Sequence, residues 1–267
     1  MAAFPGNGPI SPTSSSALST DRATDPATGA PRLRRVLYGR QSGPGLRPGQ
    51  RERLARLLPR LAIDLPEAGE LDPGALFAPE RSRIWLEIGF GGGEHLAAQA
   101  AANPAVGLIG VEPFVDGVAR LLALVESGRL DNVRLLVDDA RLLLDRLPEA
   151  SLERVFVLFA DPWPKKRHWK RRIVNPETVA RLADLLADGG ELRIATDDPG
   201  YRRWILACVL GETRLDWCVN GPEDWRHRPS DWPPTRYEAK ALAAGRRPVF
   251  LRFRRRPRAA ALATSSE

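Results

Sequence analysis

The sequence predicts an α/β protein built on a doubly wound, mostly parallel seven-stranded sheet with helices on both faces. Three observations predict this fold. From residue 83 onward, short apolar runs alternate with helix-forming runs, which is the pattern of repeated βα units. Residues 154–159 are apolar almost throughout, as expected for a parallel strand buried on both faces. Glycines at positions 89, 91, 92 and 93 directly follow the first apolar run, where a nucleotide-binding βα unit makes its tight turn.

The expected elements follow one another regularly. Strands are expected at residues 83–88, 106–111, 132–137, 154–159, 191–195, 214–219 and 248–253. Helices are expected at residues 95–102, 114–126, 140–147, 176–186 and 201–209. Pro113 stands near the first turn of the second helix, where a proline costs no hydrogen bond. A turn at residues 188–190 leads into the fifth strand. Residues 161–172 and the segment with Trp225, His227 and Trp232 are expected to be loops.

The rest of the chain divides by composition. Residues 1–30 are rich in Ala, Pro, Ser, Thr and Gly, which predicts a disordered tail. Residues 31–82 are expected to form a basic arm and a lead-in, with nine arginines and one acid, Glu52, between positions 31 and 60. A short helix is expected at residues 49–58, stopped by Pro59. Residues 83–258 are expected to form the α/β domain, and residues 259–267 a frayed tail.

Charge and cysteine content limit the functional class. The 267-residue chain carries a net charge of +7, which suggests an anionic partner such as nucleic acid, or else simply a solvated Arg-rich surface. Cys208 and Cys218 fit neither a metal-binding spacing nor a disulfide framework, which favours a reducing, cytoplasmic location. Because the cysteine spacing fits no metal site, we expect no bound metal. We expect no membrane partner, because no apolar run approaches the ~18 residues of a membrane helix.

Acidic residues stand in or directly after five consecutive expected strands: Glu87, Glu112, Asp139, Asp161 and Asp197. The carboxyl ends of parallel strands meet at one edge of a sheet, where ligands bind. Any one of these acids could instead be a helix cap or a surface charge. Five at corresponding positions favour a single site at that edge.

The glycine-rich turn indicates which nucleotide is bound. Glu112 lies 23 residues after Gly89, a spacing suited to the ribose hydroxyls of either NAD or S-adenosylmethionine. The dinucleotide fingerprint requires a third glycine where this chain has Glu94, and a carboxylate would repel a pyrophosphate. The pattern acid-x-Gly-x-Gly, from Glu87 to Gly91, instead places an acid beside a cationic methionine group. Asp139 is well placed to receive the adenine amino group. S-adenosylmethionine is therefore favoured over NAD.

A stiff basic segment follows the fourth strand. Asp161-Pro-Trp-Pro164 joins two prolines to a tryptophan, and such a loop can hold a flat base against a methyl donor. Six cations and Trp169 follow within eight residues, which favours contacts with phosphates and bases over a solvated charged loop. The cations are Lys165, Lys166, Arg167, Lys170, Arg171 and Arg172.

These motifs together resemble the bacterial tRNA (guanine-N7)-methyltransferase family, the TrmB type. The resemblance covers about residues 32–255 and rests on four segments, residues 86–95, 161–172, 195–197 and 235–238. It implies a class I S-adenosylmethionine-dependent methyltransferase fold (Rossmann-like) over residues 83–258. It also implies methyl transfer from S-adenosylmethionine to N7 of guanosine at tRNA position 46, in the variable loop, with a monomer or homodimer acting in the cytoplasm.

The resemblance also implies residue roles. Glu87, Glu112, Asp139 and Asp161 match the family's S-adenosylmethionine contacts, and Asp161 matches its catalytic position. The positions that match its substrate contacts are Lys165, Asp197, Thr235, Arg236, Tyr237 and Glu238. Arg167, Lys170, Arg171 and Arg172 are the expected tRNA phosphate contacts. The chain departs from the family pattern at Ala160, Trp169 and Asp198, and none of these changes removes a functional group.

Other readings stay open at this point. A methyltransferase acting on an exocyclic base amine also carries an acid-Pro-aromatic loop after the fourth strand, although its second residue after the acid is usually another proline. A non-catalytic tRNA-binding module of the same fold is a second alternative, which the intact acids disfavour. A dehydrogenase is a distant third, because the third fingerprint glycine is missing.

Overall fold

The structure is a computed structural model that describes residues 23–24, 31–32 and 45–258. The predicted C-terminal tail, most of the predicted N-terminal tail, and Arg34, Arg35 and Arg40 of the basic arm lie outside the described residues. The chain divides into two units, residues 1–36 and residues 37–267. In the first unit, β1 (Ala23–Thr24) pairs antiparallel with β2 (Pro31–Arg32). The second unit holds the α/β domain.

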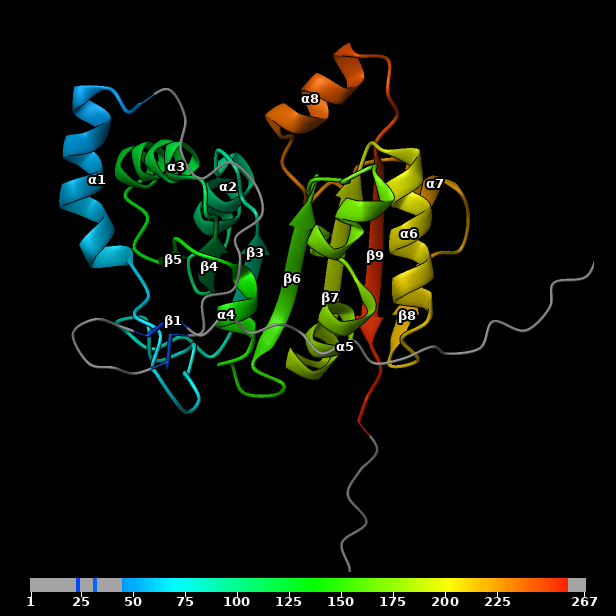
Figure 1. Cartoon of the computed structure of the whole chain (residues 1–267), viewed down its shortest axis with the longest axis horizontal. Coiled ribbons are helices and arrows are strands. Elements are labelled where there is room, and N and C mark those ends of the chain that lie inside the picture. Colours follow the sequence, from blue (N-terminus) through cyan, green and yellow to red (C-terminus); the bar gives the residue numbers. More distant parts are fainter. Residues whose placement is uncertain (1–22, 25–30, 33–44, 259–267) are drawn as a thin grey trace, which may run out of the picture. The chain divides into compact units, whose positions relative to one another are not determined.

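The α/β domain contains a seven-stranded sheet in the order β5-β4-β3-β6-β7-β9-β8 (Figure 1). The five strands from β5 to β7 are parallel, and β9 runs antiparallel between β7 and β8. This arrangement confirms the predicted doubly wound, mostly parallel sheet of a class I methyltransferase fold. The strands are β3 (Ile84–Ile88), β4 (Gly107–Val111), β5 (Val133–Leu136), β6 (Leu152–Leu158), β7 (Leu186–Thr196), β8 (Leu215–Trp217) and β9 (Val249–Arg255).

Helices cover both faces of this sheet, and each face has its own apolar core. One core receives side chains from α1 (Pro48–Leu61), α2 (Glu94–Ala102) and α3 (Val115–Gly128). The other receives side chains from α4 (Ala140–Leu144), α5 (Pro176–Leu185) and α6 (Pro199–Leu210). The strands between them are buried on both sides, as the pattern of β3 shows, where all five residues are buried.

Two segments expected to be loops contain helical turns, and a further helix forms where none was predicted. The basic segment forms a 3-10 helix, η1 (Lys166–Arg171), and the tryptophan-containing segment holds α7 (Glu223–Arg226). After it, α8 (Arg236–Ala243) lies beyond the carboxyl ends of β6 and β7 (Figure 1). The side chain of Thr235 caps α8 by accepting a hydrogen bond from the backbone of Glu238 at 3.1 Å. This capping interaction explains why a helix begins at that residue.

Two boundaries differ from the prediction for local reasons. Pro59 does not stop α1, which continues to Leu61, because the proline stands in the last turn and the residue whose carbonyl it leaves unbonded, Ala55, is exposed to water. The predicted turn at residues 188–190 is an irregularity inside β7. There the pairing with β6 jumps from Leu186 to Glu191, and Gly189 has φ +78°.

Candidate active site

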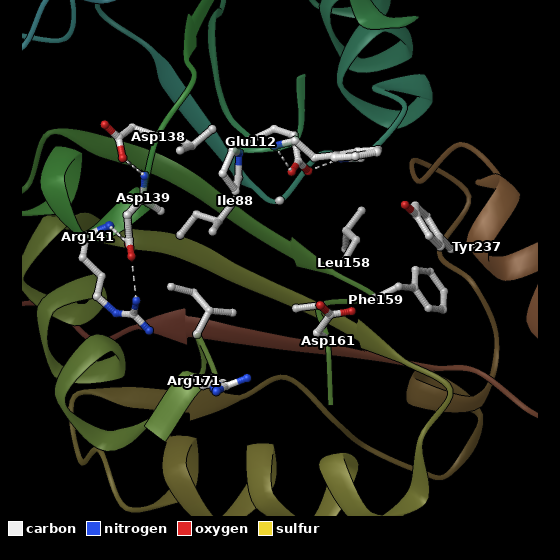
Figure 2. Close-up of a pocket in the computed structure, with 18 residues that line it drawn as sticks. Ile88, Glu112, Asp138, Asp139, Arg141, Leu158, Phe159, Asp161, Arg171 and Tyr237 are labelled. Atoms are coloured by element: carbon white, nitrogen blue, oxygen red, sulfur yellow. Dashed lines mark hydrogen bonds and ion pairs between the residues drawn. The ribbon is translucent and has the colours of Figure 1, made fainter. Parts of the chain in front are cut away.

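A pocket of about 400 Å³ opens at the carboxyl edge of the parallel strands (Figure 2). Its walls come from the ends of β3, β4, β5 and β6, from η1 and from α8. In Figure 2, Asp139 and Arg141 lie at one end, Tyr237 lies at the other, and Glu112 and Asp161 lie between them. Of the residues predicted for the site, the pocket brings together Gly89, Gly91, Glu112, Asp139, Asp161, Arg171 and Tyr237.

The glycine-rich turn is held by contacts from two helices. Gly91 has φ +57°, and a Cβ atom there would lie 2.8 Å from the ring of Tyr237 on α8. A Cβ at Gly117, in the first turns of α3, would lie only 2.1 Å from the carbonyl oxygen of Gly91. Gly117 is therefore needed for α3 to approach the turn, a requirement that the sequence analysis missed because it depends on a contact 26 residues away.

Glu112 directly follows β4 and fastens the same turn. One carboxylate oxygen accepts a hydrogen bond from the backbone N–H of Gly91 at 2.8 Å, and the other accepts one from Phe114 at 3.0 Å. The residue is 8% exposed. Burial raises the pKa of Glu112, and the two backbone hydrogen bonds oppose that rise. Each oxygen keeps a further lone pair, so the carboxylate can still accept from ligand hydroxyls at the pocket wall.

Glu87 lies beneath the turn and is not among the pocket-lining residues. It is 3% exposed, and its carboxylate pairs with Nδ1 of His95 at 2.7 Å. The other ring nitrogen of His95 faces the amide of Gln99 at 3.3 Å, and that amide donates to the backbone carbonyl of Asp231 at 2.7 Å. A direct contact between Glu87 and a methyl donor stays a prediction. The structure shows instead a buried link from the turn to the segment before α8.

Asp139 caps α4 at the opposite end of the pocket. One oxygen accepts from the backbone N–H of Arg141 at 2.9 Å, and the other pairs with the Arg141 guanidinium at 2.9 Å. The neighbouring Asp138 accepts a hydrogen bond from the backbone of Asp139 at 2.7 Å. Asp139 is thus held in a fixed orientation on the pocket wall, where it was expected.

Asp161 stands on a constrained loop. Phe159 and Trp163 on either side of it have φ +55° and +41°, which is uncommon for residues with bulky side chains. Within the described part of the chain, the Asp161 carboxylate has no hydrogen-bond or ion-pair partner, and the residue is exposed. A carboxylate in the pocket without a partner in the protein is available to a ligand.

Arg172 holds this loop from below, which contradicts its predicted role as a phosphate contact. The residue is 4% exposed, and its Nε donates to the carbonyl oxygen of Pro162 at 2.8 Å. Its guanidinium lies 4.8 to 5.2 Å from the ring centroids of Trp169, Tyr201 and Trp204. Burial lowers the pKa of Arg172. The cation is enclosed by protein and cannot reach a phosphate at the surface.

The remaining cations of the basic segment divide into two groups. Lys165, Lys166, Arg167 and Lys170 are exposed on η1 or at its start. Arg171 is half-buried, lines the pocket and lies 4.9 Å from the ring centroid of Trp163. The pKa of His168 is lowered, by partial desolvation first and then by Arg171, Arg167 and Lys165, in the direction expected for a histidine among cations.

The last predicted substrate residues surround α8. Asp197 follows β7 and pairs with Nε of Arg246 at 2.5 Å. Arg236 pairs with Glu94 at 3.6 Å, and Glu238 accepts from Nε of Arg228 at 3.1 Å. Sequence reasoning did not identify the two partner arginines, because nothing local distinguishes them from the many other arginines of this chain.

The departures from the family pattern have structural roles. Asp198 is the N-cap of α6, where its side chain accepts from the backbone N–H of Tyr201 at 2.6 Å, so its charge is used on the helix. Trp169 packs against Trp204, with ring centroids 5.1 Å apart. Ala160 packs partly against the core.

In the part of the chain that the structure describes, no group of three or more His, Cys, Asp or Glu side chains is arranged to hold a metal ion. None of the helices described is long and apolar enough to cross a membrane.

Residues 81–251 match a protein family described as "Putative methyltransferase". A tRNA (guanine-N(7)-)-methyltransferase of Rhodospirillum rubrum is 53% identical over 233 residues, which cover 86% of this chain and 91% of that protein. A protein of the same name from Azorhizobium caulinodans is 50% identical over 82% of this chain and 95% of its own length. One from Chelativorans sp. is 45% identical over 82% of this chain and 94% of its own length.

Proposed function

The chain belongs to the tRNA (guanine-N(7)-)-methyltransferase family, and from this premise we propose that it methylates N7 of guanosine 46 in the variable loop of tRNA, with S-adenosylmethionine as donor. The observation that carries the proposal is one pocket in which the unpartnered carboxylate of Asp161 lies together with Glu112, Asp139 and the glycine-rich turn. The cytoplasm, where tRNA is modified, is the proposed location, and the protein acts as a monomer or homodimer.

The residues along the pocket fit an S-adenosylmethionine site. A Cβ at Gly89 would meet no atom within 4 Å, so the backbone there is open to a ligand. Glu112 would accept hydrogen bonds from the ribose hydroxyls, and Asp139 from the adenine amino group. The buried carboxylate of Glu87 lies beneath the turn, and its negative charge would favour the cationic methionine end of the donor. The donor supplies an electrophilic methyl group on a sulfonium sulfur.

The guanine would lie between the Asp161 loop and α8. We propose that Asp161 and Asp197 accept hydrogen bonds from its N1–H and its exocyclic amine. Trp163 and Pro164 would shape the pocket beside the base, and the segment from Thr235 through Arg236 and Tyr237 to Glu238 would close it from the far side. Tyr237 is suited to this role because it already contacts the turn at Gly91.

The protein's task in this reaction is to position and to stabilise charge. N7 of guanine carries an in-plane lone pair, so no proton has to be removed before attack and no general base is required. Orientation of two reactants can supply up to about 7 to 11 kcal/mol of the barrier reduction. The methylated base is cationic, and the carboxylate of Asp161 would stabilise the charge as it develops.

The exposed cations would hold the tRNA backbone. Lys165, Arg167 and Lys170 are placed beside the pocket on one side of the Asp161 loop, where phosphates flanking the target base would pass. Arg171 would act at the pocket wall. Arg172 is excluded from this group by its burial.

Replacing Asp161 tests the catalytic proposal. Asp161→Asn keeps the size of the side chain and removes its charge, and we expect kcat to fall about 100-fold or more. Because Asp161 has no partner within the described chain, the melting temperature should stay nearly unchanged. The Kd for tRNA should change little, because phosphate contacts supply most of the affinity. The reaction is followed by mass spectrometry of 7-methylguanosine in digested tRNA. Methylation at the wild-type rate would rule out the assignment.

The same digests test the remaining alternatives. Methylation of an exocyclic amine would give a nucleoside with a different fragmentation pattern and retention time. A non-catalytic tRNA-binding module would give no methylated product and would fail to bind labelled S-adenosylmethionine. The pocket acids argue against the second alternative, because a module that only binds tRNA has no need for Glu112 and Asp139 in the wall of such a pocket.

A further inference from the structure

The carboxylate that we assign to the guanine is already bound by an arginine of the same chain. Nε of Arg246 donates to Oδ2 of Asp197 at 2.5 Å. The Arg246 side chain is 47% exposed and that of Asp197 is 23% exposed, so water reaches the cation more readily than the carboxylate. The two residues follow different elements, β7 and α8, and their ion pair joins the ends of these elements, although neither residue lines the pocket itself.

The position of Arg246 is fixed by the end of α8. Gly245 has φ +69°, and its N–H donates to the carbonyl of Leu242 at 2.9 Å. The N–H of Arg246 donates to the carbonyl of Ala241 at 2.9 Å. These two bonds form the Schellman motif, which sets the backbone of the second residue beyond a helix. The backbone of Arg246 is therefore held by the helix end in a position from which its side chain reaches Asp197.

Arginine and guanine present the same donors to a carboxylate. The N1–H and the exocyclic amine of guanine belong to a guanidine group enclosed in the ring. The guanidinium of arginine offers N–H donors in the same fork-like arrangement, which matches a carboxylate. A carboxylate that binds one of these groups is suited to bind the other, but one side of Asp197 cannot hold both at once.

We propose that Arg246 is an internal competitor of the target guanine, which occupies Asp197 in the tRNA-free enzyme and has to leave when the base enters. This inference rests on the proposed role of Asp197 in guanine binding. When only a fraction of the protein is competent to bind, the apparent affinity falls by that fraction. An exposed ion pair of this kind favours the state in which Arg246 occupies Asp197 over the state in which Asp197 is free by a ratio of up to about 5 to 1. Arg246 thus weakens tRNA binding by about two- to fivefold.

The neighbouring Arg247 provides a matched control. It is exposed, it carries the same charge, and it makes no hydrogen bond or ion pair within the described part of the chain. Loss of either arginine removes one positive charge from the same surface and weakens attraction to RNA equally. The comparison of Arg246→Ala with Arg247→Ala therefore isolates the competition for Asp197.

The experiment measures the Kd for unmethylated tRNA in the presence of S-adenosylhomocysteine. We expect Arg246→Ala to bind two- to fivefold more tightly than Arg247→Ala. With a tRNA that carries an abasic nucleotide at the target position, the two variants should bind alike, because no base then competes for Asp197. Equal or weaker binding of intact tRNA by Arg246→Ala would overturn the proposal, as would the same advantage on abasic tRNA.

Asp197→Asn separates this proposal from the one on which it rests. If Asp197 does not bind guanine, Asp197→Asn will methylate tRNA with an unchanged KM, and the proposed guanine site is wrong. If Asp197→Asn raises KM while Arg246→Ala and Arg247→Ala bind intact tRNA alike, the guanine site stands and the competition alone is refuted.

Discussion

The charge of the buried Glu112 carboxylate lowers the stability of the folded protein. Its carboxylate is buried, and burial raises its pKa above the ordinary value for glutamate. The folded pKa therefore exceeds the unfolded one, so protonated Glu112 favours folding at low pH and this contribution is lost as the pH rises through the folded pKa. At neutral pH the ionised group therefore lowers the stability of the free protein. This cost is consistent with the ligand contact that we propose for Glu112.

The raised pKa predicts how cofactor affinity depends on pH. As the pH falls toward the raised pKa of Glu112, protonation removes a hydrogen-bond acceptor from the pocket. The affinity for S-adenosylhomocysteine should therefore begin to fall at a higher pH than it would if Glu112 had an ordinary glutamate pKa. Glu112→Gln should bind about 10- to 100-fold more weakly at neutral pH and should lose this pH dependence. Titration calorimetry from pH 5 to pH 8 measures both. The same pH dependence in the variant would assign it to another group.

At the scale of residues, the sequence predicted the acids and missed their partners. The positions of Glu112, Asp139 and Asp161 at the pocket could be predicted, because the end of a strand can be recognised in the local sequence. Parallel strands then bring their carboxyl ends together. The contacts of Gly117 with Gly91 and of Arg246 with Asp197 could not be predicted. Each depends on how two distant segments approach, which local pattern does not encode.

Among the elements, η1 combines two functions that composition alone could not separate. Its exposed cations face solvent, whereas Arg172 directly after it is enclosed by three aromatic rings and holds the Asp161 loop. The sequence Lys165 to Arg172 reads as one uniform basic run. The structure divides this run, because Arg172 lies on the buried side of the turn and the exposed cations lie on the other. The packing of Trp169 against Trp204 determines which side is buried.

This division predicts opposite phenotypes for two neighbouring cations. Arg172→Ala leaves the Pro162 carbonyl and three rings without their cation, and we expect a loss of about 2 kcal/mol in the free energy of unfolding and a severe loss of activity. Lys170→Ala should leave the melting temperature unchanged, weaken tRNA binding and reduce its salt dependence by about one phosphate contact. Thermal melts and tRNA titrations at several salt concentrations distinguish them. A stable, active Arg172→Ala protein would contradict the enclosed role.

The missed helix α8 has a similar explanation. It is eight residues long, and its two large apolar residues, Tyr237 and Leu242, are both exposed, so no stretch of core-forming residues marks it in the sequence. The residues that flank it, Thr235 at the N-cap and Gly245 beyond the C-cap, are typical capping residues, but a cap is informative only when the pattern between the two ends is helical. Helices α2, α3, α5 and α6, each of which buries several apolar residues, were predicted within a few residues.

At the scale of the whole molecule, ligand binding and folding are linked. A ligand that binds only the folded state at 100 times its Kd adds about 2.7 kcal/mol to the free energy of unfolding. For a domain of this size, that corresponds to a rise of about 5 to 10 °C in melting temperature. We expect S-adenosylhomocysteine to produce such a rise in the wild-type protein and a much smaller one in Glu112→Gln. An equal rise in both would remove Glu112 from the cofactor site.

The place of β9 in the sheet has a consequence for biosynthesis. This strand, Val249–Arg255, follows the other strands of the sheet in the chain and leaves the ribosome after them, yet it lies between β7 and β8. Until it arrives, a nascent chain holds every acid of the pocket but exposes the open edge of β7, which can pair with other chains. A message truncated just before Val249 would therefore yield a substrate for chaperones and proteases, and not a partial enzyme.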